Sequence, residues 1–421
     1  MDAPVLIALW QSVAFVHPFA LGRPLGEAEI AWAIQAGMGP LLHAATREAP
    51  ERVPEALAPR LEGADRWARV QSADALDAAA EIIDRCADRA SPLTLLKGIS
   101  ICGQYYPSPH QRFLGDLDLL VEPEDVPAVT GALDELGYQP PEAAPVRDYT
   151  AHHHLRPVLH PRTKVCVELH TGLFPPSQGL DRGPFSPAAL RGERRPSTLD
   201  GRPVFRLSPE LQIPYIASHW ALDFVPAAGA RALLDMVLLL RGEADRLDWA
   251  RLLGWLEDPR IAAHLQLMLS YLEARELVEL PPELRADWRR VAVLNPLALR
   301  ILTGMVDRYQ VRGLMQRVPS IARSGLRESP SGVAARGRFR SRLGTLREAV
   351  ASGNFRGLLL ILDTITWERF LVRPRSAWNL LLVPWCLLFP PGDPDRFLPG
   401  HQLRRLGGVL SGLAHRCSTG W

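Results

Sequence analysis

The spacing of apolar residues changes twice along the chain and divides it into a helical part, a mixed part and a second helical part. In the first 90 residues, apolar positions recur every three or four residues, which is typical of amphipathic helices. The expected elements are helices over residues 4–10, 28–42 and 72–90, the last beginning at Ser72, and a loop over residues 50–59. The pattern predicts a helical region at the N-terminus.

From Ser91 the pattern becomes that of short strands and helices. Strict alternation is clearest in residues 116–121 (DLDLLV), as in a strand with one buried face. The expected elements are strands over residues 91–97 and 116–121, helices over 98–106 and 124–136, and a hairpin of extended stretches over 152–160 and 164–170. Residues 172–209 are rich in Gly, Pro and Arg, and they predict a loop with one short strand near residues 204–207.

Helical spacing returns at Pro209 and continues over residues 210–222, 231–240, 249–256, 261–277 and 294–309. The whole pattern predicts an α+β fold, in which a small mixed β-sheet is flanked by N-terminal and C-terminal helical regions. The expected division is a helical region (1–90), a sheet core (91–208), a helical domain that closes the cleft (209–310), and an Arg-rich loop with a C-terminal helical segment (311–421).

Composition excludes few classes of protein. Of the 421 residues, 47% are apolar, which is ample for a packed core, and a formal net charge of +2 gives no bulk attraction to nucleic acid. The N-terminus lacks the basic segment of a signal peptide, and no apolar run reaches the roughly 20 residues that span a bilayer. Residues 377–390 come nearest, but Pro384 interrupts them, so they predict a buried segment with Trp378 and Trp385 in the core. The alternative is a segment that lies on a membrane surface or docks a partner.

The cysteines and basic residues refine this picture. The five cysteines are odd in number and have no metal-binding spacing, so they predict free thiols in a cytoplasmic protein. They are Cys86, Cys102, Cys166, Cys386 and Cys417. Lysine occurs only at Lys97 and Lys164, which indicates that a compact ammonium is needed there. An arginine-rich run has few aromatic residues and favours a solvated loop over a nucleic-acid surface, with an anionic acceptor as the alternative. Its members are Arg317, Arg323, Arg327, Arg336, Arg338, Arg340 and Arg342.

Three acidic residues carry the clearest chemical signal. Asp116 and Asp118 stand two positions apart on a predicted strand, so their side chains share a face, where they repel each other unless a cation lies between them. Glu168 alternates in the same way in a second predicted strand. Oxygen ligands suit a hard divalent cation, and three carboxylates can hold two magnesium ions for displacement at phosphorus, with Mn²⁺ as the alternative ion.

A phosphate-binding element precedes these acids. Gly98 follows a predicted strand and opens a predicted helix, whose N-terminal N–H groups would face a phosphate. Lys97 and Arg112 would add positive charge, and Ser100 a hydroxyl. Arg112 has a competing interpretation, a structural ion pair with one of the aspartates.

These residues resemble a known family. The segments LKG, GDLDLLV and VELH, with an arginine before the second, resemble the uncharacterised bacterial nucleotidyltransferases of the DNA polymerase beta-like superfamily. The resemblance covers residues 90–280 well and reaches the segments LSPELQIPYIASHWALDF and ALLDMVLLL. In the superfamily a serine usually follows the turn glycine, whereas Ile99 follows Gly98 here.

The resemblance implies an enzyme that transfers a nucleoside monophosphate from a nucleoside triphosphate, ATP in the first instance, and releases pyrophosphate. Asp116, Asp118 and Glu168 would be both catalytic and metal-binding, and Lys97, Gly98, Ser100 and Arg112 would bind the triphosphate. The acceptor would be a small molecule or a peptide natural product. Two alternatives remain open: nucleotidyl modification of a protein or RNA, as by a toxin, and a non-catalytic module that senses nucleotide.

The remaining polar candidates have structural alternatives. His170 shares a strand face with Glu168 and could be a base, a carboxylate partner or a buried histidine. His219 and Asp235 are candidates for the acceptor site or a buried polar pair. Neighbouring residues of a strand point to opposite faces, so the run 152–154 (HHH) predicts a solvated or substrate-facing strand rather than a zinc site.

Overall fold

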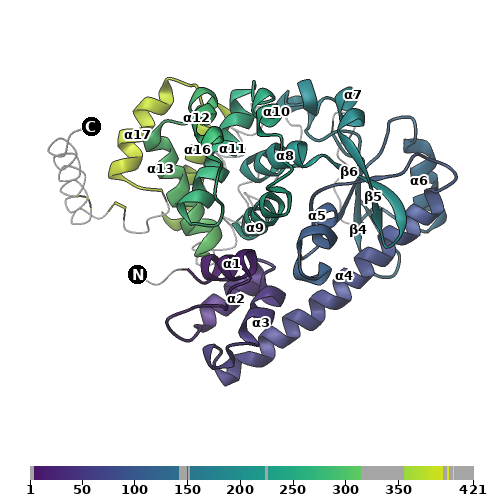
Figure 1. The fold of residues 1–421 in the computed structure, drawn as a ribbon, viewed down its shortest axis with the longest axis horizontal. Helices are drawn as coiled ribbons and strands as arrows, with labels where there is room; N and C mark the ends of the chain where they lie inside the picture. Colours follow the sequence, from purple (N-terminus) through teal and green to yellow (C-terminus); the bar gives the residue numbers. More distant parts are fainter. Residues whose placement is uncertain are drawn as a thin grey trace.

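The computed structural model describes residues 4–141, 149, 152–222, 226–313, 355–391, 396, 397 and 402. The arginine-rich run from Arg317 to Arg342 lies outside the described residues. Figure 1 shows the sheet on one side of the molecule, a bundle of helices on the other, and the N-terminal helices below both. The predicted α+β class is confirmed.

The N-terminal region is helical, as expected, but two of its expected boundaries are wrong. Its helices are α1 (Val5–Phe15), α2 (Glu27–Gln35), α3 (Gly39–Thr46) and α4 (Ala58–Cys86), with short 3-10 turns at Pro50–Arg52 and Glu55–Leu57. The helix expected over 28–42 is divided at Gly37, whose φ of 75° only glycine adopts readily. Helix α4 begins at Ala58 rather than at Ser72, which is buried inside it. It runs from the N-terminal helices to the far side of the sheet (Figure 1).

The mixed part forms one six-stranded sheet in the order β3-β4-β2-β1-β6-β5. The strands are β1 (Thr94–Leu95), β2 (Leu117–Leu120), β3 (Val158–Leu159), β4 (Cys166–His170), β5 (Arg194–Leu199) and β6 (Arg202–Leu207). Strand β2 is parallel to β4 and antiparallel to β1, and β3 and β4 form the expected hairpin. Helix α5 (Lys97–Tyr105) follows β1, α6 (Val126–Glu135) follows β2, and the short α7 (Pro187–Leu190) precedes β5.

Strand β5 was not expected, because residues 172–209 were predicted to be mostly loop. It pairs along its whole length with β6 at the edge of the sheet. An edge strand needs one partner only, so it tolerates Pro196 and exposed polar side chains. These are the features that made the segment resemble a loop.

The two faces of the sheet belong to different parts of the core. Leu117, Leu119 and Leu169 pack in one apolar cluster with residues of α4 and α6, such as Ile82 and Leu133. Because strand side chains alternate, Asp118 and Glu168 project from the opposite face. That face is turned toward the helical bundle, where Leu120 packs in the second apolar cluster.

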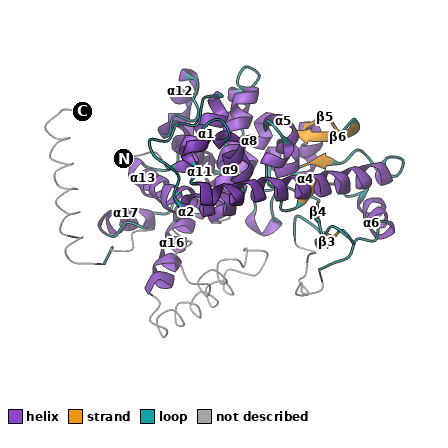
Figure 2. Ribbon diagram, turned by 90° about the horizontal axis from the view of Figure 1, so that it is seen from below, coloured by secondary structure: helices purple, strands orange, loops and turns teal. Residues whose placement is uncertain are grey.

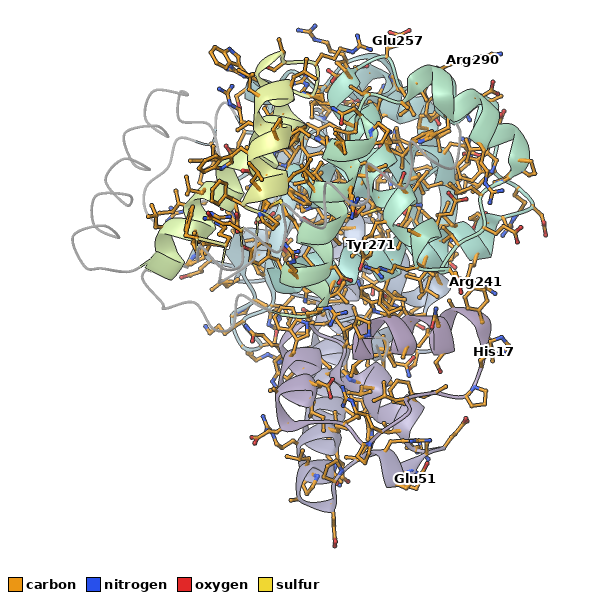
Figure 3. All side chains as sticks on the ribbon, turned by 90° about the vertical axis from the view of Figure 1, so that its left-hand side faces the viewer. His17, Glu51, Arg241, Glu257, Tyr271 and Arg290 are labelled. Carbon is orange, nitrogen blue, oxygen red and sulfur yellow. The ribbon has the colours of Figure 1, made fainter. Side chains whose placement is uncertain are left out.

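The helical bundle follows β6. Its helices are α8 (Pro209–Leu222), α9 (Pro226–Glu243), α10 (Trp249–Gly254), α11 (Pro259–Ala274), α12 (Pro282–Val291), α13 (Pro296–Met305) with a π-helical turn at Val306–Val311, α16 (Phe355–Val372) and α17 (Trp378–Leu388). Figure 2 shows α8, α9 and α11 grouped on one side and the strands on the other. In Figure 3, Tyr271 of α11 lies inside the bundle, whereas Glu257 and Arg290 lie at its surface.

Helix α17 contradicts the expected burial of residues 377–390. Trp378 and Trp385 are 64% and 50% exposed, and Leu380 and Leu381 are exposed as well. The expectation followed from hydropathy alone, which does not reveal whether another element covers a helix. Among the described residues, no helix combines the length and the apolar character that crossing a membrane requires.

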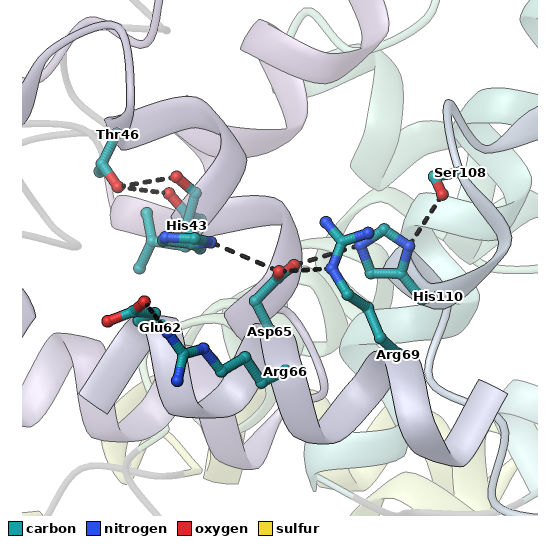
Figure 4. Close-up of polar contacts among 9 residues, drawn as sticks. His43, Thr46, Glu62, Asp65, Arg66, Arg69, Ser108 and His110 are labelled. Carbon is teal, nitrogen blue, oxygen red and sulfur yellow. Dashed lines mark hydrogen bonds and ion pairs between the residues drawn. The ribbon is translucent and has the colours of Figure 1, made fainter. Parts of the chain in front are cut away.

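A polar cluster attaches the N-terminal helices to the loop before β2 (Figure 4). Asp65 of α4 is buried, and its carboxylate contacts His43 of α3 at 3.7 Å, Arg69 at 2.8 Å and His110 at 3.1 Å. His110 also makes a 2.8 Å hydrogen bond with Ser108. Three segments therefore meet at one carboxylate, which fixes the short turn Pro109–Gln111 immediately before Arg112.

Candidate active site

Asp118 and Glu168 lie directly beside each other on neighbouring strands. The parallel register of β2 and β4 pairs Asp118 with Glu168 and Leu120 with His170. Neighbouring strands are only about 4.8 Å apart, so two carboxylates on one face are held close together. Asp118 is fully buried, and Glu168 is half-buried. The strand pairing itself brings together two of the three predicted carboxylates.

Two nitrogen groups bind Asp118. Lys97 Nζ and His170 Nε2 each lie 2.8 Å from its Oδ1 atom. Burial opposes the charge on Asp118, but the Lys97 ammonium and the His170 hydrogen bond outweigh it and hold the pKa of Asp118 well below its usual value. Among the described residues, no hydrogen bond or ion pair reaches Oδ2. The carboxylate is therefore ionised and has one oxygen available as a ligand.

Lys97 reaches Asp118 from an uncommon backbone conformation. Its φ is 47°, in the left-handed region that residues with a Cβ atom seldom adopt. Such strain costs on the order of 1–3 kcal/mol and persists where the surrounding structure imposes it. Burial disfavours the ammonium, yet the charge of Asp118 raises the pKa of Lys97 well above its usual value.

His170 joins the carboxylates, while Asp116 lies at their margin. Ligand atoms of Asp118, Glu168 and His170 all lie within 4.8 Å of one another, which is close enough for one ion. Asp116 precedes β2 and is exposed to solvent. The charge on Asp118 raises the pKa of Asp116 to about 6, so the two aspartates interact. Burial lowers the pKa of His170, which favours its neutral form.

The residues predicted to hold phosphate lie at the start of α5. Gly98 is buried, and a Cβ atom there would stand 2.9 Å from Leu114 Cδ2 and 3.4 Å from the guanidinium of Arg112. A larger residue would require the side chains of Leu114 and Arg112 to move, so glycine allows them to pack closely against the helix. Ser100 is buried as well, and its hydroxyl lies 3.4 Å from Gln212 Oε1 in α8. Its contact in this structure is with the helical bundle.

Arg112 pairs with Asp235 rather than with Asp116 or Asp118. Its Nε and Nη2 atoms donate to the two oxygens of Asp235, both at 2.7 Å, and Tyr106 donates to the same carboxylate at 2.8 Å. Arg112 therefore forms a structural ion pair, as the alternative interpretation expected, but with Asp235. His219, the other acceptor-site candidate, is half-buried on α8 near the ring of Tyr215.

Two residues that the sequence analysis did not single out lie beside the carboxylates. Tyr215 of α8 is buried, and its hydroxyl has no hydrogen-bond partner in the part of the chain that the structure describes; burial raises its pKa. Arg231 of α9 is near enough to Asp116 to lower the pKa of that carboxyl. Arg231 stands four positions before Asp235, so it shares a helix face with it. That four-residue spacing could have indicated Arg231 only weakly, because it does not reveal which residues pack against this face of the helix.

The histidine run also differs from its prediction. Imidazole nitrogens of His152, His153 and His154 lie within 4.8 Å of one another, so the three side chains gather together. The argument from strand alternation was wrong because these residues precede β3 and form no regular strand. The rings of His153 and His154 lie 5.1 Å and 5.4 Å from that of His170, so the run packs beside the carboxylate centre.

Comparison with known proteins identifies the family of the chain. The model of a family described as "Uncharacterised nucleotidyltransferase" matches residues 27–275, which is more than half of the chain. The matched range contains every candidate site residue named above. No curated protein and no solved structure matches the chain significantly.

Proposed function

The chain belongs to this family of uncharacterised nucleotidyltransferases, and on that premise we propose that it is a metal-dependent enzyme that transfers a nucleoside monophosphate from a nucleoside triphosphate to an acceptor. The observation that carries the proposal is the pairing of Asp118 with Glu168, with Asp116 beside them. Membership supports nucleotidyl transfer, and the carboxylates support the dependence on metal.

The donor atoms fit magnesium, with manganese as the alternative. Asp116, Asp118 and Glu168 offer carboxylate oxygens, the ligands that hard divalent cations prefer. Lys97 and His170 both contact Oδ1 of Asp118, so Oδ2 remains for an ion. Two ions bound there would activate the attacking oxygen and stabilise the charge that develops during in-line displacement.

In the proposed reaction, an acceptor oxygen forms a bond to the α-phosphorus while the bond from that phosphorus to the bridging oxygen of the β-phosphate breaks. Pyrophosphate leaves with the electron pair, and the acceptor proton passes to Glu168. His170 holds Asp118 in place and lies 3.7 Å from Glu168, so it orients both carboxylates. Lys97 and the start of α5, at Gly98, face the triphosphate.

The donor is proposed to be ATP and the acceptor a small molecule or a peptide natural product. His219 stays a candidate for the acceptor site, because it lies on the same helix as Tyr215, which approaches the carboxylates. Asp235 is a weaker candidate, because Arg112 and Tyr106 already engage both of its oxygens.

The direct test uses ATP labelled at the α-phosphate, magnesium and a cell lysate fractionated by size. Label in small molecules that requires magnesium and disappears in Asp118→Asn supports the proposal. Label on protein or RNA assigns the chain instead to modification of macromolecules. Binding of ATP that is independent of metal, without transfer, contradicts the enzyme and supports a nucleotide sensor.

A further inference from the structure

Arg231 lies at the edge of the proposed active site and forms no ion pair with any residue that the structure describes. Its guanidinium lies over the ring of Phe113, with Cζ 4.9 Å from the ring centre. Its Nε atom is buried and has no hydrogen-bond partner among the residues that the structure describes. Burial and the neighbouring Arg112 lower the pKa of Arg231 to about 10, so it remains charged at neutral pH. Asp235 and Asp116 act on this guanidinium from a distance, but its donors are not fully engaged, and a bound anion would engage them.

The position of Arg231 is built by its neighbours. Phe113, beneath the guanidinium, stacks on Trp67 of α4 with ring centres 5.4 Å apart. Gly37 leaves room for both side chains, because a Cβ atom there would lie 3.0 Å from Arg231 Cδ and 3.0 Å from Phe113 Cβ. Segments from α4, the turn after α2 and the loop before β2 therefore hold one arginine side chain in place.

Positive charge continues from Arg231 to the start of α5. Arg112 adds a second guanidinium, whose charge Asp235 balances, and Arg231 brings a further positive charge near Asp116. Arg112 in turn lies against Gly98, where the N-terminal N–H groups of α5 begin. Both arginines lower the pKa of Asp116, so this basic zone borders the carboxylates on the Asp116 side.

We propose that Arg231 binds the β- and γ-phosphates of the nucleoside triphosphate, with the start of α5 as the opposite wall of the site. The pyrophosphate leaving group then lies on the α9 side of Asp116, and the acceptor approaches from the side of His170 and Tyr215. A guanidinium offers several N–H donors in a fixed plane, which matches the oxygens of a phosphate. This inference rests on the proposed function, because it assigns the donor orientation within the same site.

Calorimetry of the full chain with three probes tests the inference: magnesium–ATP, magnesium–tripolyphosphate and AMP. Arg231→Met is expected to weaken both triphosphate probes by about 10-fold or more and to leave AMP binding unchanged, since a charged hydrogen bond is lost only at the outer phosphates. The affinities of Arg231→Lys for the two triphosphate probes are expected to lie between those of the wild type and those of Arg231→Met. The Met variant should fold, because it breaks no ion pair of the described residues and keeps an apolar stem beside Phe113, and thermal unfolding checks this.

Arg241→Met is the matched control. Arg241 lies on the same helix and also covers an aromatic ring, Phe15 at 4.4 Å, but it is exposed and lies beside α1 (Figure 3). Its substitution should change none of the three affinities. If the wild-type chain binds magnesium–ATP and Arg231→Met binds it equally well, or loses AMP to the same degree, the inference fails while the proposed function stands. If the wild-type chain binds no triphosphate, both fail.

Discussion

Asp118 and Asp235 are both buried aspartates that meet a cation and a hydroxyl or imidazole donor, yet their surroundings differ. Asp235 has both oxygens engaged, by Arg112 and Tyr106, and lies between α5 and α9. Asp118 receives both of its contacts on Oδ1 and has Glu168 and Asp116 as neighbours. The first centre is electrostatically complete, whereas the second has an excess of negative charge. A carboxylate whose oxygens are all engaged and whose charge is balanced is structural, whereas one with a free oxygen and acidic neighbours is suited to bind an ion.

The largest expected effect is on stability at Asp235. Asp235→Asn keeps the shape but leaves Arg112 buried beside Arg231 without its counter-charge. Breaking a buried pair in this way should lower the free energy of unfolding by about 3–5 kcal/mol, as measured by urea denaturation at pH 7. Asp200→Asn is the control, because Asp200 is 89% exposed in its pair with Arg202 and should contribute little. Equal losses in the two variants would contradict the structural role of Asp235.

The matching substitution at the other centre should change ion binding. Asp118→Asn removes a charged ligand and is expected to weaken Mn²⁺ binding by at least about 10-fold, as followed by electron paramagnetic resonance. Asp235→Asn should bind Mn²⁺ as the wild type does, provided that it is measured below its unfolding midpoint. If the two variants exchanged these behaviours, the assignment of the two centres would be reversed.

Two buried tyrosines, one beside each aspartate, should show the same difference with smaller changes in stability. Tyr106→Phe deletes a donor to Asp235 and should lower the free energy of unfolding by about 1–3 kcal/mol. Tyr215→Phe deletes a hydroxyl that bonds to none of the described residues, so stability should stay the same or rise, while nucleotidyl transfer falls. Denaturant titration of both variants separates these cases. A larger stability loss for Tyr215→Phe would show that its hydroxyl is structural.

The smallest expected effect concerns Asp116 and pH in the metal-free protein. Its pKa is about 6 when folded, compared with 3.8 ordinarily, so between these values the folded chain holds a proton that the unfolded chain releases. Stability contributed by this group therefore falls as pH rises from 4 to 6. Asp116→Asn should be more stable than the wild type at pH 7, by about 1 kcal/mol or less because Asp116 is exposed, and equal to it at pH 4. A constant difference across this range, or added magnesium failing to reduce it, would contradict repulsion by Asp118 as the cause.

Much of the fold could be predicted where the information is local. Alternation in residues 116–121 predicted β2, and the glycine after an apolar run predicted the turn into α5. Predictions were wrong where an element depends on what packs or pairs beside it. The polar edge strand β5 needs β6 beside it, and the exposed face of α17 depends on what lies against it.

The candidate site divides in the same way. Residue spacing along the chain indicated that Asp118 and Glu168 each face one side of a strand, because the side-chain period of a strand is a local property. Only the tertiary structure decided that β2 and β4 pair in the register that sets Asp118 beside Glu168 and brings Lys97 and His170 onto Oδ1. It also decided that Arg112 belongs to Asp235, while Arg231 and Tyr215 approach the carboxylates from the helical bundle. These contacts join residues from 21 to more than 100 positions apart, such as Lys97 with Asp118 and Arg112 with Asp235, and the packing of the whole chain, not any local pattern, selects them.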